Sequence, residues 1–256
     1  MENQLLNANT QKFWKEQYDL DGFIYIPGFL SLDEISALRK ELDSLDLNKM
    51  PPEKVYYENK ERPDTLKQLQ HLFNYSPLFK ETMFESKFTE LANLLLGEKA
   101  IGKNMQFFNK PPKLGKPTPP HQDGYYFMLE PQNAITMWLA LEDVDEENGC
   151  VRYVKGSHKE GMRPHGRTAV LGFSQAMLDF PQESDLQHEV YFRVKPGDLL
   201  AHHSLTIHWA DGNQSENRTR KSLGFIYYGE NAKVDEAAHK FYQEKLAREL
   251  KEKDSI

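Results

Sequence analysis

The sequence contains a single cysteine, Cys150, and no apolar run long enough to cross a membrane as a helix. One cysteine cannot form an intramolecular disulfide, which suits a reducing compartment. Residues 1–17 lack the basic region and the continuous apolar segment of a secretory signal peptide. We therefore expect a cytoplasmic protein that does not associate with membranes.

An excess of basic charge is also absent. The chain has 39 acidic and 32 basic side chains, which gives a formal net charge of −7. Proteins that bind nucleic acid need clustered Lys and Arg side chains to neutralise phosphates, so we expect no nucleic-acid partner. A small acidic substrate is still compatible with a local basic pocket. The 256 residues are enough to bury a sizeable core in one domain.

Residues 1–100 are predicted to be mainly helical and to support the rest of the domain. The pattern predicts helices over 9–20 and 32–45, two shorter helices that open at Ser76 and Ser86, and one strand over 23–26. Ser31 and Glu34 form a capping box before the second helix. Residues 48–69 are polar and contain prolines, which predicts an irregular covering loop or lid.

After Gly97 the pattern changes to short strands separated by Pro and Gly. The candidates are 105–109, 134–141, 150–154, 189–194, 198–202 and 221–228. Strands without helices between them favour a sandwich or jelly roll over parallel βαβ units. An amphipathic surface helix is predicted from Asp235 to about Lys251. We therefore expect one domain over 1–256, with helical support in 1–100, a jelly-roll core in 101–230 and a C-terminal helix in 231–256.

His121-Gln122-Asp123 is the first candidate for chemistry. Two residues that are two apart on a strand point to the same face, so His121 and Asp123 can hold one ion together. Two histidines and one carboxylate form the set that selects non-haem Fe(II) and leaves positions open. The triplet alone is explained equally well by a surface turn. For the missing ligand we prefer His208, and we interpret His202 and His203 as a satisfied strand histidine and its exposed neighbour.

Such an iron site commonly binds a 2-oxo acid, whose far carboxylate favours a guanidinium partner. Arg218 and Arg220 have the same parity on a late strand, so either could serve, and Arg220 is preferred because it lies deeper in the apolar run. Thr136 and Trp138 share one face of the 135–141 strand and could line the cosubstrate site. Core packing explains Trp138 equally well.

Several motifs occur in the order typical of one known family. They are Asp21-Gly22-Phe23, Pro27-Gly28-Phe29, Asn109-Lys110-Pro111-Pro112, His121-Gln122-Asp123, Tyr126-Phe127, Trp138 to Glu142, Asn148-Gly149-Cys150, Gly156 to Lys159, Pro196-Gly197-Asp198, His208 and Arg220-Lys221. From about residue 20 to 230 the chain resembles the phytanoyl-CoA dioxygenase family. The resemblance implies a cupin-like double-stranded β-helix with flanking helices. It also implies an oxygenase that uses Fe(II), 2-oxoglutarate and O2.

The resemblance also implies roles for individual residues. The iron ligands would be His121, Asp123 and His208, and Arg220 would hold the far carboxylate of 2-oxoglutarate. Gln106 and Trp138 fall where relatives line the cosubstrate pocket. The chain departs from many relatives at Ala210, where a serine is common, and it retains the carboxylate ligand that halogenating relatives lack. The implied reaction is therefore hydroxylation of an aliphatic C–H bond, with succinate and CO2 as coproducts.

The substrate is less well defined by the sequence. Arg163, His165 and Tyr126 are candidates for contact with a small, anionic metabolite, and lysines flank the loop before the metal motif. Solvated loop charges explain the same cations. Two other functions stay open, namely a cupin-like metalloenzyme that does not use 2-oxoglutarate and a non-catalytic jelly-roll binding protein.

Overall fold

The structure is a computed structural model that describes residues 7–170, 173–237, 240 and 244. Most of the helix predicted from Asp235 to Lys251 lies outside the described residues. Within the described part of the chain, no helix has the length and apolar character needed to cross a membrane.

The largest sheet, here called the major sheet, has seven antiparallel strands in the order β1-β12-β7-β14-β4-β3-β2. Their bounds are β1 (Phe23–Ile26), β12 (Leu199–His203), β7 (Ala134–Ala140), β14 (Arg220–Gly229), β4 (Ala100–Lys110), β3 (Leu66–Leu69) and β2 (Val55–Tyr57). Side chains alternate between its two faces, as they must on a strand. On β7, Ile135, Met137 and Leu139 belong to the main hydrophobic core, whereas Trp138 and Ala140 belong to a second cluster between the sheets.

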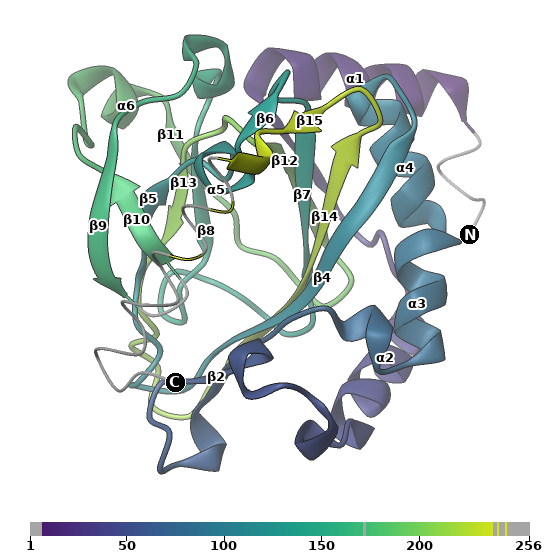
Figure 1. The fold of residues 1–256 in the computed structure, drawn as a ribbon, viewed down its shortest axis with the longest axis vertical. Helices are drawn as coiled ribbons and strands as arrows, with labels where there is room; N and C mark the ends of the chain where they lie inside the picture. Colours follow the sequence, from purple (N-terminus) through teal and green to yellow (C-terminus); the bar gives the residue numbers. More distant parts are fainter. Residues whose placement is uncertain (1–6, 171–172, 238–239, 241–243, 245–256) are drawn as a thin grey trace.

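A four-stranded sheet, the minor sheet, has the order β11-β8-β13-β5. It consists of β11 (Glu189–Tyr191), β8 (Val151–Val154), β13 (His208–Ala210) and β5 (Thr118–His121). Two strand pairs complete the β structure: β9 (His165–Val170) with β10 (Phe173–Met177), and β6 (Leu129–Glu130) with β15 (Lys233–Val234). In Figure 1 the minor sheet lies on one side of the major sheet and the long helices on the other. The predicted jelly-roll architecture with flanking helices is confirmed.

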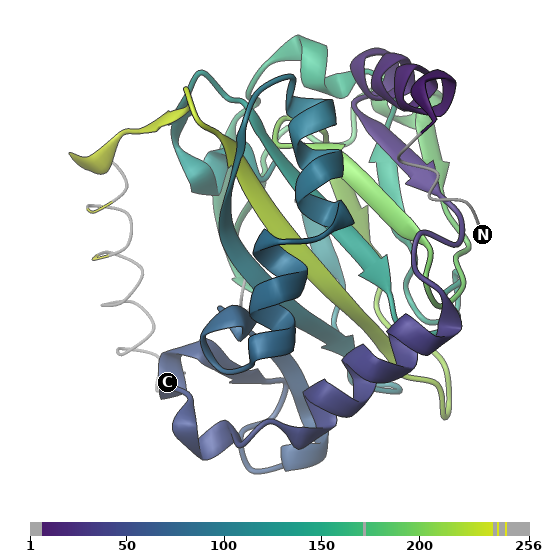
Figure 2. The same ribbon diagram turned by 90° about the vertical axis from the view of Figure 1, so that its right-hand side faces the viewer.

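The long helices begin where side-chain caps satisfy their first amides. They are α1 (Ala8–Asp21) after Asn7, α2 (Leu32–Ser44) after Ser31, α3 (Pro77–Phe84) after Ser76 and α4 (Lys87–Leu96) after Ser86. The predicted capping box of Ser31 and Glu34 is present. Figure 2 shows α2, α3 and α4 across the outer face of the major sheet. Phe88 of α4 stacks on Phe225 of β14 with ring centroids 4.0 Å apart, which joins the helical layer to the sheet.

The prediction of an irregular lid over residues 48–69 is wrong in part. This segment contains β2 and β3, which extend the edge of the major sheet, between the short 3-10 helices η2 (Leu47–Lys49), η3 (Pro52–Lys54) and η4 (Pro63–Thr65). Gln68 and Leu69 pair with Phe108 and Phe107 of β4. The strands are too short to show a period of two, and their hydrogen-bond partners lie far along the chain. Residues 1–100 therefore contribute three strands as well as helices.

The six strands predicted after Gly97 all occur, with changed ends. β4 begins earlier than predicted, at Ala100, and β11 ends earlier, at Tyr191. The remaining short elements are the α-helices α5 (Gly124–Phe127) and α6 (Glu183–Gln187) and the 3-10 helices η5 (Leu72–Asn74) and η6 (Ser157–Glu160). The sequence did not predict strands β5 and β13, which carry the candidate histidines His121 and His208.

Candidate metal centre

Two histidines face one another across neighbouring strands of the minor sheet. His121 is the last residue of β5 and His208 the first of β13, and the antiparallel register sets them directly opposite one another. Their ring centroids are 4.1 Å apart, and both side chains are buried. Directly opposed residues on antiparallel strands are near neighbours, so the pairing of the sheet alone brings these imidazoles together.

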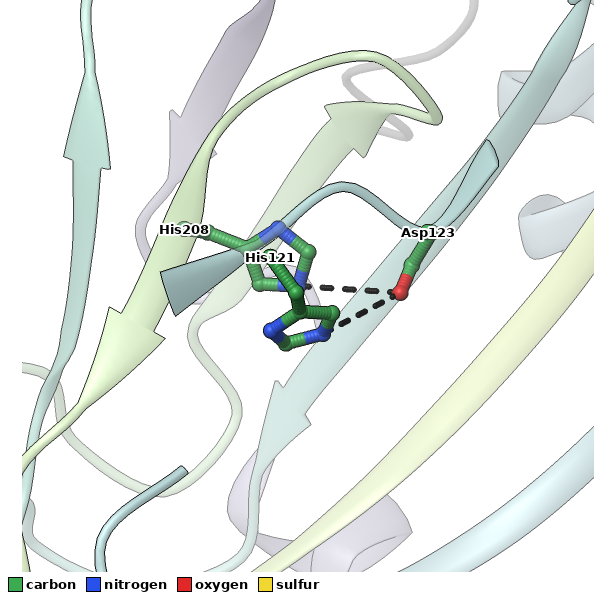
Figure 3. A group of neighbouring side chains, drawn as sticks. All are labelled: His121, Asp123 and His208. Atoms are coloured by element: carbon green, nitrogen blue, oxygen red, sulfur yellow. Dashed lines mark ion pairs between the residues drawn. The ribbon is translucent and has the colours of Figure 1, made fainter. Parts of the chain in front are cut away.

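Asp123 reaches the histidines from a position that the sequence analysis did not predict. The prediction that it shares a strand with His121 is wrong, because β5 ends at His121 and Asp123 has helical backbone angles (φ −58°, ψ −33°) just before α5. A turn, rather than strand alternation, directs its carboxylate. In Figure 3, Asp123 Oδ1 points toward both imidazoles, at 3.4 Å from His121 Nε2 and 3.7 Å from His208 Nε2.

These three side chains fit a divalent metal ion. Their ligand atoms all lie within 4.8 Å of one another, and no other cluster of this kind occurs in the described part of the chain. His121 Nδ1 lies 2.7 Å from the carbonyl of Pro119, and His208 Nδ1 lies 3.0 Å from that of Thr206. Because a carbonyl only accepts, each Nδ1 carries the proton and each Nε2 keeps a lone pair that can bind metal.

The charges of the group also suit a cation. Burial alone would raise the pKa of the Asp123 carboxyl, but the imidazoles of His208, His121 and His202 hold that pKa well below its usual range. Burial, together with His121 and His202, holds the pKa of His208 well below its usual value. An ionised carboxylate beside a neutral imidazole is the protonation state that metal binding requires.

The second carboxylate oxygen of Asp123 is bound by the major sheet. The Thr136 hydroxyl of β7 donates to Asp123 Oδ2 at 2.5 Å, and His202 Nε2 of β12 lies 3.3 Å from the same oxygen. The Thr136 hydroxyl, expected beside the cosubstrate, is thus engaged by a candidate metal ligand. His202 is a satisfied strand histidine, as expected. His203 is half-buried rather than exposed, and its Nδ1 accepts from the amide of Leu205.

Arg220 and Arg218 have very different surroundings. Arg218 lies at the surface and donates to Asp145 and Glu147. Arg220 is 4% exposed and its guanidinium lies over the Trp138 ring, 5.4 Å from the centroid. Its Nε has no hydrogen-bond partner, and burial lowers the pKa of this guanidinium to about 10. A buried cation with an unpartnered N–H is chemically suited to receive a carboxylate from a ligand.

Trp138 and Gln106 lie on the same face of the major sheet as Arg220. Gly224 of β14 pairs with Trp138 of β7 on one side and with Gln106 of β4 on the other, so Trp138, Gly224 and Gln106 form a row across the three strands. Arg220 lies on β14 four residues before Gly224 and therefore faces the same side. Gln106 Oε1 accepts from Gln68 Nε2 at 2.5 Å, which leaves Gln68 Oε1 buried without a partner. This face therefore combines an indole, a guanidinium and one amide oxygen without a partner, as a polar ligand site would.

The three candidates for substrate contact are already engaged within the protein. The Tyr126 hydroxyl donates to the carbonyl of Gln175 at 2.7 Å. Arg163 is 9% exposed and pairs with Asp185 at 2.7 Å and with Asp179 at 3.1 Å. His165 stacks on the Tyr125 ring with centroids 4.5 Å apart, and its Nε2 accepts from the amide of Gln122. The sequence pattern could not reveal the partners of Arg163, because Asp179 and Asp185 lie 16 and 22 residues further along the chain.

A family model described as Phytanoyl-CoA dioxygenase (PhyH) matches residues 18–222. The chain belongs to the phytanoyl-CoA dioxygenase family. Among curated members, the peroxisomal phytanoyl-CoA dioxygenase of Rattus norvegicus is 28% identical, over 98% of this chain and 76% of that protein. The phytanoyl-CoA dioxygenase of Arabidopsis thaliana is 29% identical, over 80% of this chain and 84% of that protein.

Solved structures show the same architecture. The non-haem α-ketoglutarate-dependent carbocyclase SnoK of nogalamycin biosynthesis is 26% identical, with a TM-score of 0.70 over 87% of this chain and 85% of that one. EctD from S. alaskensis, solved with 2-oxoglutarate and 5-hydroxyectoine, is 18% identical, with a TM-score of 0.70 over 90% and 78% of the chains, and shows likeness of fold alone. As a member of its family, this protein is a dioxygenase that uses Fe(II), 2-oxoglutarate and O2.

Proposed function

We propose that this protein hydroxylates an aliphatic C–H bond of a small, anionic metabolite, and that His121, Asp123 and His208 hold the iron. The convergence of these three side chains between two sheets carries the proposal. Fe(II) bound there would supply the activation of O2 that is coupled to decarboxylation of 2-oxoglutarate.

The chain's own residues bind and orient the reactants in this proposal. The guanidinium of Arg220 receives the far carboxylate of 2-oxoglutarate. The face of the Trp138 ring packs against this guanidinium and orients it. The carbonyls of Pro119 and Thr206 keep the two imidazoles in the tautomer with a free Nε2. The strands that carry His121 and His208 bury the centre, which limits access of water.

An excess of buried positive charge near Arg220 supports an anionic substrate. Lys67 pairs with Glu58 at 3.1 Å, and both side chains are more than nine-tenths buried. Lys110 donates to the carbonyls of Ala210 and Asp211 instead of a carboxylate. Burial, and after it the charges of Arg220 and Lys67, hold the pKa of Lys110 well below its usual value, so an anion placed beside these groups would offset a repulsion between them.

Anaerobic titration of the protein with Fe(II) and 2-oxoglutarate tests the cofactor part of the proposal. The visible charge-transfer band of the iron chelate is expected in the wild type and is expected to be lost in His121→Ala. His188→Ala is the matched control, because His188 is an exposed histidine bonded only to the carbonyl of Ser184. A wild type that binds Fe(II) without this band would contradict the use of 2-oxoglutarate at this site.

A screen of succinate release tests the substrate class. Carboxylic acids and phosphonates are compared with their neutral amides and esters, and CoA thioesters are included because curated relatives are phytanoyl-CoA dioxygenases. We expect the anionic member of a pair to give more succinate and a product heavier by one oxygen. A product of unchanged oxygen content would instead indicate a reaction such as ring closure, the activity in the name of the carbocyclase SnoK.

A further inference from the structure

Tyr153 of the minor sheet and His202 of the major sheet form a hydrogen-bonded chain that ends at Asp123. Tyr153 Oη on β8 lies 3.0 Å from His202 Nδ1 on β12, and His202 Nε2 lies 3.3 Å from Asp123 Oδ2. The Tyr153 and His202 side chains are almost fully buried, at 0% and 2% exposure. Buried polar atoms that meet in series in this way constrain one another strongly.

The direction of donation along this chain is determined by its ends. An Asp123 that binds metal is a carboxylate and can only accept, so the His202 Nε2 that lies 3.3 Å from its Oδ2 carries a proton. In a neutral imidazole Nδ1 is then an acceptor, and the Tyr153 hydroxyl must donate to it. The order is therefore Tyr153 to His202 to Asp123.

The two oxygens of Asp123 consequently have separate tasks. Oδ2 accepts from Thr136 and His202, whereas Oδ1 faces the imidazoles of His121 and His208. We propose that Tyr153 and His202 are positioning residues that keep Asp123 a ligand through Oδ1 alone. This inference rests on the proposed role of Asp123 as an iron ligand.

The physical value of this arrangement lies in the number of ligand positions. Two imidazoles and one carboxylate oxygen occupy three positions, which leaves the others for cosubstrate and O2. A carboxylate that binds through both oxygens takes one more position and competes with 2-oxoglutarate. Two donors on Oδ2 oppose that rotation, because binding through Oδ2 would leave Thr136 and His202 unpaired in a buried site.

Aromatic rings packed around the hydrogen-bonded chain hold Tyr153 and His202 in place. Phe23 of β1 stacks on Tyr153 with centroids 4.6 Å apart and an interplanar angle of 16°. The His202 ring lies against His208, with centroids 4.2 Å apart. The strand register places His202 opposite Phe23 on one side and Thr136 on the other. Packing between the two sheets therefore fixes the hydrogen-bonded chain of Tyr153, His202 and Asp123.

Four variants test the inference with readouts other than turnover. Tyr153→Phe removes one oxygen atom and keeps the stacked ring, and His202→Leu removes both nitrogens. His202→Gln keeps an amide N–H near the position of Nε2, whereas His202→Asn keeps one only near Nδ1. Each protein is titrated anaerobically with Fe(II) and 2-oxoglutarate, and the metal dissociation constant and the chelate band are recorded.

We expect Tyr153→Phe, His202→Leu and His202→Asn to weaken metal binding by about tenfold to a hundredfold, as the loss of an outer partner of a metal ligand typically does. Their chelate band should shift or weaken, and their apparent dissociation constant for 2-oxoglutarate should rise. His202→Gln should recover most of the wild-type band, which a merely structural role of His202 would not predict.

His203→Gln is the matched control, because His203 is the next residue on β12 and packs against His158 outside the centre. Wild-type metal affinity and an unchanged band in both Tyr153→Phe and His202→Leu would overturn the inference and leave the proposed function intact. If His202→Leu fails to fold, Tyr153→Phe decides alone. Failure of the wild type itself to bind Fe(II) would instead contradict the proposed function.

Discussion

His208 lies directly opposite His121 across the antiparallel pair β5–β13, with their ring centroids 4.1 Å apart. The pairing of two strands therefore brings the two imidazoles together, and Asp123 joins them from the turn before α5. A site assembled in this way should bind metal only in the folded state, which links metal binding to stability.

The first prediction concerns this link. A divalent ion such as Mn(II), Co(II) or Fe(II) at 100 times its dissociation constant should stabilise the fold by about 2.7 kcal/mol. For a chain of this size the corresponding rise in melting temperature is about 5–10 °C. Thermal melts with and without metal should show the rise in the wild type and in His188→Ala, and none in His121→Ala. An equal rise in His121→Ala would place the ion elsewhere.

The second prediction separates the two candidate arginines. Arg220 is buried with an unpartnered Nε, whereas Arg218 is already paired with Asp145 and Glu147 at the surface. Arg220→Ala should raise the KM for 2-oxoglutarate by about tenfold to a hundredfold, because a charge-assisted pair in a dry site contributes about 1.5–3 kcal/mol. Arg218→Ala should change this KM by less than about threefold, since exposed pairs contribute little. The reverse result would make Arg218 the anchor.

The third prediction concerns Arg163. Its removal would leave Asp185, with 3% side-chain exposure, as a buried charge without its partner. Arg163→Ala should therefore lower the free energy of unfolding by about 3–5 kcal/mol. Arg193→Ala breaks the exposed pair with Glu146, which water and salt screen, and should leave the stability nearly unchanged. Urea denaturation measures both. Unchanged stability in Arg163→Ala together with a raised substrate KM would restore Arg163 as a substrate contact.

The fourth prediction concerns pH. Burial, assisted by the charges of His158 and His202, lowers the pKa of His203 to about 4. Because the unfolded chain binds this proton near pH 6.5 and the folded chain only near pH 4, stability falls as the pH drops through that window. The contribution of one such group is at most about 1.4 kcal/mol per pH unit. His203→Gln should therefore show a shallower loss of unfolding free energy between pH 6.5 and 4 than the wild type. Identical slopes in the two proteins would contradict the shift.

Much of the architecture could be predicted from local patterns. The helices could be predicted from N-cap residues such as Ser31 and Ser86, because these side chains bond to amides only a few residues away. The strands after Gly97 were visible because β-branched and aromatic residues lie between Pro and Gly turns. The order of motifs also allowed His121 and His208 to be chosen as partners, since a late strand of a jelly roll pairs with an early one.

What escaped prediction depends on contacts between distant segments. The strands β2 and β3 exist because β4 offers them an edge, and their own residues show no clear alternation. Asp123 reaches the histidines through a turn whose angles the sequence does not encode in any obvious motif. Tyr153 gave one usable signal, since it alternates with the outward Arg152 on a short strand, but its bond to His202 requires knowing how the two sheets face one another.

The two sheets make unequal contributions to the proposed centre. His121 and His208 belong to the minor sheet, whereas the carboxylate of Asp123 is tied through Oδ2 to Thr136 and His202 of the major sheet. An ion bound by His121, His208 and Asp123 would therefore link the two sheets of the sandwich. The spacing of the two sheets would then set where Asp123 lies relative to His121 and His208, so that substitutions of the packed rings between the sheets would alter the metal centre from a distance.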